Sequence, residues 1–268
     1  MYRHAMKKHS QALQVVAALA LLFIVRSPTA WAATVNANAA HGKKLVYVYN
    51  QIKLEKSRKA EPGDPKRIAQ LESWRKNDED AMQFLRSLGF TVSGSSEATP
   101  VDAAVKGQDL VIISESVDAV DVDAKYRYVA VPLLTFENDL LGELGMTDLK
   151  NGRDYGTDDG QRFIWLVNAP HPLAAGLAAG IQDVLTDEHC KMSWGKPGLG
   201  AVTIATLRGE PEKAAIFAYE KGATMNGEAL APARRVSFFL WQDTFDQMRP
   251  EGMALLRAAV LWAVSPPE

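Results

Sequence analysis

Short apolar runs separated by amphipathic segments fill the first half of the chain after residue 42. The runs have the length and the Val, Ile, Leu and Tyr content of β-strands. The predicted strands are 43–50, 90–93, 109–116 and 129–134. Segment 109–116 (DLVIISES) is polar only at its ends, which is typical of a strand buried on both faces of a parallel sheet.

The segments between these runs predict helices. Residues 66–88 carry apolar side chains at mostly helical spacing, Asp64 can cap this helix with Pro65 in its first position, and Gly89 ends it. Shorter helices are predicted at 100–106, at 121–126 with Asp121 as the cap, and at 138–144. The charged segment 51–64 is predicted to be an exposed insertion.

The second half of the chain is richer in strands. Predicted strands at 162–168, 200–207, 214–219 and 235–240 are joined mostly by turns, and a helix at 250–264 closes the chain. Strands alternating with helices predict right-handed βαβ units. The expected fold class is α/β: a doubly wound, mostly parallel sheet with helices on both faces and a β-rich C-terminal half.

The N-terminus has the pattern of a signal peptide. A basic start without acidic residues precedes the apolar run 15–25, and small residues end at Ala32. A membrane span needs about 20 apolar residues, so this run is too short. We expect residues 1–32 to be a cleaved signal peptide, 33–42 a flexible lead-in and 43–268 a single domain; the alternative is an uncleaved anchor. The mature chain would begin near Ala33 and be periplasmic or secreted.

Charge and cysteine content narrow the possible partners. Without residues 1–32, the chain has 26 basic and 32 acidic residues, a net charge near −6. This argues against nucleic acid, and against a membrane after signal cleavage, because both attract clustered positive charge. Cys190 is the single cysteine, so no intramolecular disulfide can form. The oligomeric state stays open.

Polar side chains at strand ends are the candidate ligand contacts, because ligands of open α/β sheets bind beyond the carboxyl ends of the strands. The predicted set is Asn50, Ser114, Glu115, Ser116 and His171. Parallel strands would bring these side chains to one crevice, where Glu115 and His171 are the candidate acid/base pair. The alternative is that loop 51–65 or loop 151–160 fills this edge.

Each of these residues also has a second interpretation. His171 stands between two prolines and could present its imidazole to a ligand or only close a loop. Ser116 lacks the glycines of a nucleophile elbow. Trp194, in a loop with glycine and proline, could stack on a sugar, or it could be a buried anchor.

No cofactor or metal site is predicted. Residues 187–190 (DEHC) are metal-ligand types, but consecutive positions on a strand face opposite ways. The aspartates near 118–123 and 154–159 do not have the spacing of a calcium loop. Neither a P-loop nor a dinucleotide-binding glycine motif occurs in the sequence.

Several segments together resemble the ThuA-like (trehalose-utilisation) group of the class I glutamine amidotransferase-like superfamily. They span about residues 43–264: the DLVIISES strand, residues 171–177 (HPLAAGL), Asp187 and Glu188, and residues 235–239 (RVSFF) leading to 255–263. The resemblance implies a flavodoxin-like three-layer core. Members of this group look like secreted or sugar-pathway proteins.

The sequence departs from true amidotransferases at the nucleophile. Their cysteine follows a central strand, where this chain has Ser114, Glu115 and Ser116. Glutamine hydrolysis is therefore not expected. Two functions stay open: a domain that binds a small polar ligand, for which a saccharide fits best, or a carbohydrate-directed enzyme that uses His171 and Glu115.

Overall fold

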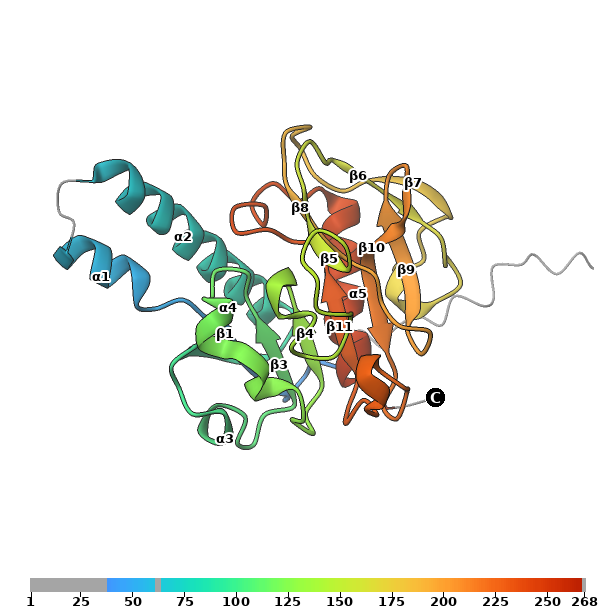
Figure 1. Cartoon of the computed structure of the whole chain (residues 1–268), viewed down its shortest axis with the longest axis horizontal. Coiled ribbons are helices and arrows are strands. Elements are labelled where there is room, and N and C mark those ends of the chain that lie inside the picture. Colours follow the sequence, from blue (N-terminus) through green and yellow to red (C-terminus); the bar gives the residue numbers. More distant parts are fainter. Residues whose placement is uncertain (1–37, 61–63, 267–268) are drawn as a thin grey trace, which may run out of the picture. The chain divides into compact units, whose positions relative to one another are not determined.

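The computed structural model describes residues 38–60 and 64–266, all within one compact unit. The predicted signal peptide lies outside the described residues. The four apolar runs of the first half form parallel neighbours in one sheet (Figure 1). In spatial order they are β2 (Thr91–Ser96), β1 (Lys44–Tyr49), β3 (Leu110–Ile113) and β4 (Leu133–Thr135).

The second half extends this sheet mainly with antiparallel strands. β11 (Arg235–Phe238) pairs in parallel with β4, and after it come β10 (Glu210–Tyr219), β9 (Val202–Leu207), β6 (Phe163–Leu166) and β7 (Gly180–Asp183), each antiparallel to the one before. β8 (Met192–Gly195) pairs with β10 and with β5 (Tyr155–Asp158). The sheet is therefore mixed, and the prediction of a mostly parallel sheet is wrong for its C-terminal half.

The two faces of the sheet are covered unequally. α2 (Pro65–Ser87) and α5 (Pro250–Val264) pack on one face, against Leu45 and Ile112 among others. On the other face, Val46 and Val111 belong to a core cluster of loop, strand and short helical residues, and the described helices near it are single turns. These are α3 (Val101–Ala104), α4 (Ala119–Val122), η2 (Asp123–Tyr126) and η3 (Asn138–Leu140). The long helices of a doubly wound fold are thus present on one face alone.

Local signals explain the helix boundaries. The Asp64 carboxylate accepts a hydrogen bond from Arg67 N (3.0 Å) with Pro65 in the first position, which confirms the predicted cap of α2. The expected insertion 51–64 instead contains the helix α1 (Lys53–Ala60). Asp121 is not a cap, because α4 starts after Asp118 and includes it.

Several expectations for less regular segments need correction. Ala40, in the predicted flexible lead-in, is fully buried and packs in the core. The strands β5, β7 and β8 were not predicted, because their sequences mix glycine and polar residues with few β-branched ones. None of the helices in the described ranges has the length and apolar character to cross a membrane.

A buried arginine fixes the amino end of β11. Arg235 has 0% of its surface exposed, and burial lowers the pKa of its guanidinium to about 10, so it is charged at neutral pH. Its two terminal nitrogens donate hydrogen bonds to five backbone carbonyls, those of Arg127, Val129, Val131, Ala233 and Arg234. The segment before β4 is thereby held against β11.

Candidate functional site

The carboxyl ends of β1 and β3 meet around a buried carboxylate, Asp78 of α2. Asp78 accepts hydrogen bonds from the hydroxyls of Tyr47 (3.0 Å), Ser114 (2.5 Å) and Ser116 (2.7 Å). The Ser116 hydroxyl in turn accepts from Asn50 N (3.1 Å). The predicted group of Asn50, Ser114 and Ser116 therefore converges, but its hydroxyls are engaged by the protein rather than directed at a ligand.

Sequence reasoning missed Asp78, although a signal was present. Asp78 is seven residues from both Leu71 and Leu85, so it lies in the apolar stripe of α2. A carboxylate in such a stripe must find buried donors. Burial raises the pKa of Asp78 to about 6, while the three hydroxyl donors act in the opposite direction.

Glu115 lies beside this group without a partner of its own. Its side chain is buried, and its Oε2 atom has no hydrogen-bond partner within the described residues. Burial, and then the nearby carboxylates Glu137 and Asp139, raise the pKa of Glu115 well above its ordinary value. Glu115 and Asp78 line a cavity of about 20 Å³, which has room for about one water molecule.

A second buried carboxyl follows β4. Glu137 Oε1 accepts a hydrogen bond from Asp139 N (2.8 Å), and burial raises the pKa of Glu137 to about 8. Asp139 is exposed as a residue, but partial burial of its carboxyl raises its pKa as well. Across the described ranges, no three side chains of His, Cys, Asp or Glu are arranged to hold a metal ion.

His171 and Glu115 lie at opposite ends of the strands: Glu115 at the carboxyl ends of the parallel strands, and His171 near their amino ends. Its Nδ1 accepts from Leu173 N (3.1 Å) at the start of η4 (Pro172–Ala174), and its ring packs on Trp262 (5.6 Å between centroids). The Trp262 carbonyl accepts from Arg234, which directly precedes β11, so this contact marks the amino ends of the parallel strands.

Strand direction explains this separation. His171 follows β6, which runs antiparallel to β11, β4 and β3, so the end of β6 points away from the end of β3. The prediction that His171 and Glu115 share one crevice assumed parallel strands throughout. The His171 ring instead packs against Trp262 of α5, as the second interpretation of this residue describes.

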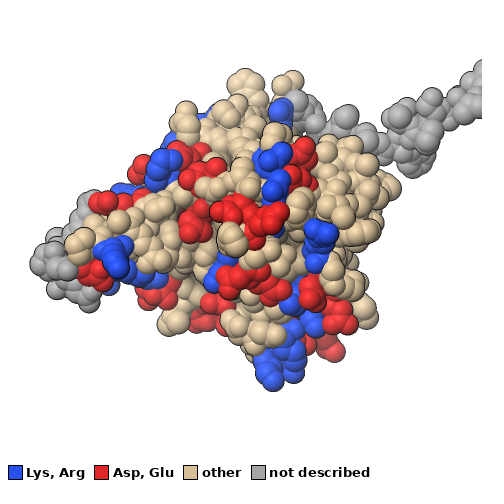
Figure 2. Space-filling view, turned by 90° about the horizontal axis from the view of Figure 1, so that it is seen from above, with Lys and Arg blue, Asp and Glu red and all other residues tan. Residues whose placement is uncertain are grey.

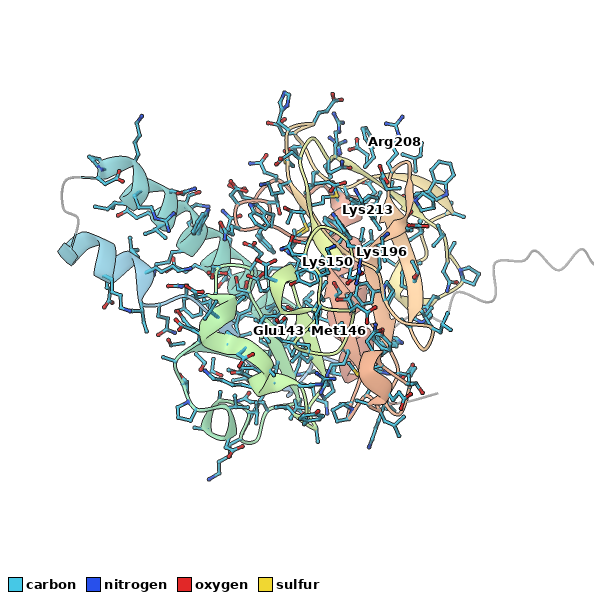
Figure 3. All side chains as sticks on the ribbon, viewed as in Figure 1. Glu143, Met146, Lys150, Lys196, Arg208 and Lys213 are labelled. Carbon is cyan, nitrogen blue, oxygen red and sulfur yellow. The ribbon has the colours of Figure 1, made fainter. Side chains whose placement is uncertain are left out.

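Trp194 is a buried anchor in β8. Its Nε1 donates to Asp158 Oδ1 (2.9 Å), and the ammonium of Lys213, labelled in Figure 3, lies 5.1 Å from the ring centre. Lys213 also pairs with Asp158 (2.6 Å). With 3% of its surface exposed, Trp194 joins β8 to β5 and β10 and presents no face to a ligand.

A larger groove begins where β11 ends. It has a volume of about 450 Å³, and Trp241, three residues beyond β11, forms part of its wall. Trp241 also lines the small cavity of Glu115. The other lining residues come from the end of β5, the turn before β8 and the segment before α5: Asp159, Asp187, His189, Cys190, Lys191, Asp243 and Gln247.

The groove combines one aromatic ring with several charges. Lys191 Nζ lies 4.9 Å from the centre of the Trp241 ring and 3.3 Å from Asp159 Oδ1. Asp187 and Asp243 add two more carboxylates. Sequence analysis did not select Trp241, although an aromatic residue followed by polar ones directly after a strand is the signal that strand-end reasoning uses.

The single cysteine is in an environment that disfavours a thiolate. Burial, and then the carboxylates Asp187, Asp243 and Asp246, raise the pKa of the Cys190 thiol. Reactive cysteines have the opposite surroundings, with cationic groups or a helix N-terminus nearby. The structure therefore gives Cys190 no evident catalytic role.

The fold and groove define a mixed α/β protein with a polar groove at the carboxyl ends of its parallel strands. No protein-family model and no curated protein sequence matches the chain. Among solved structures, the chain is similar to a crystal structure from Thermoplasma acidophilum described as that of a GMP synthase subunit. The TM-score is 0.46 at 10% sequence identity, over 82% of this chain and 94% of that chain. A similarity of this size does not assign the chain to a family.

Proposed function

We propose that this protein is an exported, ThuA-like domain of the glutamine amidotransferase-like superfamily that binds a small polar ligand, of which a saccharide fits best. The observation that carries the proposal is the groove at Trp241. An indole ring can stack on the apolar face of a sugar, while carboxylate and amide groups such as Asp243 and Gln247 can bind its hydroxyls. Export is tested by the mass of the secreted chain, which should begin near Ala33.

Binding without turnover is the better-supported form of this proposal. An enzyme that used His171 and Glu115 together would need both groups at one ligand, and they lie at opposite ends of the strands. The hydroxyls of Ser114 and Ser116 are both held by Asp78. Because these hydroxyls are engaged and the candidate acid/base pair is separated, ligand binding in the groove is better supported than catalysis.

Replacing Trp241 by Leu is expected to remove most of the affinity for a sugar. Loss of the stacking surface should weaken binding by about two- to tenfold, because aromatic contacts contribute about 0.5–1.5 kcal/mol beyond the area they bury. A thermal-shift screen of the mature chain against mono- and disaccharides identifies the ligand, and calorimetry compares the variants. Trp165→Leu is the matched control, since Trp165 is 45% exposed on β6 and does not line the groove. Equal loss in both variants, or no sugar bound by the wild type, would contradict the proposal.

Replacing Cys190 by Ser is expected to leave the protein folded. Neither the variant nor the wild type is expected to hydrolyse glutamine. Neither form should release ammonia from glutamine, because the thiol pKa is raised and the thiolate is scarce at neutral pH. A coupled assay for ammonia measures this. Ammonia release by the wild type that disappears in the variant would show that Cys190 is a nucleophile after all.

A further inference from the structure

The groove at Trp241 has an excess of negative charge. Three aspartates line it, and the ammonium of Lys191 is already paired with one of them, Asp159. Acidic side chains also gather in the middle of the face shown in Figure 2. A phosphorylated or acidic sugar would meet this negative charge unfavourably, whereas a cation would be attracted.

Lys191 shows where a cation can lie in this groove. Its ammonium is over the face of Trp241 and beside Asp159, an arrangement that combines a cation–π contact with an ion pair. The Lys191 side chain is one-third exposed, so water or a ligand can reach it. The side chain occupies, within the protein itself, the place that a ligand ammonium would take.

The buried acid behind Trp241 is a second and independent observation. Glu115 has 3% of its surface exposed, and its Oε2 finds no hydrogen-bond partner in the part of the chain that the structure describes. The cavity that Glu115 lines shares the Trp241 wall with the groove. The charge of Asp243, in the groove, acts on Glu115. Glu115 thus places a buried acid directly behind the aromatic wall of the groove.

From these observations we infer that the groove selects a ligand with an amine, an amino sugar, whose ammonium displaces that of Lys191 from Trp241 and pairs with the groove carboxylates. The inference rests on the proposed sugar-binding function and names the class of sugar. The indole ring serves both parts of such a ligand, since it can accept an ammonium or the apolar face of a pyranose ring.

Three matched sugars test this selection by calorimetry on the mature chain at low salt. Glucosamine is expected to bind about tenfold more tightly than glucose. N-acetylglucosamine, which keeps the size of the substituent without its charge, should lose that advantage. The preference for glucosamine should also fall as salt is added, because the groove is open to solvent and its charges are screened.

Variants separate the role of Lys191 from that of the groove as a whole. Lys191→Met should bind glucosamine several-fold more tightly, because the competing internal cation is gone and Asp159 is released. Lys196→Met is the matched control and should bind like the wild type, since Lys196, labelled in Figure 3, pairs with Glu212 and does not line the groove. Thermal unfolding without ligand checks that all variants are folded.

The outcomes distinguish this inference from the function on which it rests. Equal affinity for glucose and glucosamine, with both lost in Trp241→Leu, would overturn the amine selectivity and leave sugar binding intact. Weaker glucosamine binding by Lys191→Met would also overturn it, since Lys191 would then be a ligand contact. Failure of all three sugars to bind would overturn both proposals.

Discussion

Replacing Glu137 by Gln is expected to stabilise the protein at pH 8 by on the order of 3 kcal/mol, with little effect at pH 4.5. Burial raises the pKa of Glu137 from 4.5 to about 8. Near neutral pH, the carboxyl is therefore protonated in the folded protein and ionised in the unfolded chain. Gln resembles the protonated form and can still accept the hydrogen bond from Asp139 N.

The pH dependence gives the sign of this effect. Above the unfolded pKa of 4.5 the unfolded state binds fewer protons than the folded state, so the free energy of unfolding falls as pH rises toward about 8. Glu115, whose pKa is also raised, adds to the same trend. Urea unfolding between pH 4.5 and pH 8 measures the slope, which should be shallower in Glu137→Gln than in the wild type.

Glu212→Gln is the matched control for this experiment. Glu212 is exposed, and Lys196 holds its pKa below the ordinary value. Its replacement by Gln should bring no gain in stability at pH 8. Parallel stability curves for the wild type and Glu137→Gln would show that Glu137 is ionised in the folded protein.

Replacing Arg235 by Met is expected to cost about 4 kcal/mol or more of the free energy of unfolding. Five carbonyls accept from this guanidinium, and leaving a buried acceptor unsatisfied costs about 1–3 kcal/mol. Methionine fills most of the volume and isolates the hydrogen-bonding contribution. Arg235→Lys keeps the charge but has fewer donors and lacks the planar guanidinium. We therefore expect its free energy of unfolding to lie between those of the wild type and Arg235→Met.

Chemical denaturation of these variants measures the loss. Arg208→Met is the control: Arg208, labelled in Figure 3, stacks on Phe163 at the surface, and its replacement should change stability by less than about 0.5 kcal/mol. A loss for Arg235→Met no larger than for Arg208→Met would mean that water replaces the guanidinium at these carbonyls.

The sequence predicted the elements whose local signals and burial agree. The closing helix was predicted at 250–264 and is α5, and the cap and proline of α2 were both predicted. The fully buried runs of β3 and β11 were found for the same reason, since an uninterrupted apolar run has few alternatives. The short strands β7 and β8 were missed because their pairing is set by distant partners.

The prediction of the candidate site depended on the direction of each strand in the sheet. The local pattern of apolar and polar residues does not encode that direction. Asn50, Ser114 and Ser116 were expected to meet, and they do, because β1 and β3 are parallel neighbours. His171 was placed with them by the same rule, which does not hold for β6. Asp78 and Trp241 each had a signal in the sequence, but their position at the strand ends follows only from the packing of α2 and of the segment after β11.

The parallel pairing of β4 with β11 has a consequence for the order in which the chain can fold. Leu133 pairs with Arg235, so an early strand finds its second neighbour only after about a hundred further residues have been made. Until then, a nascent chain carries β4 with one open, apolar edge, which is a site for aggregation or chaperone binding. A chain truncated before residue 235 would keep that edge open, whereas a chain that includes β11 can close it.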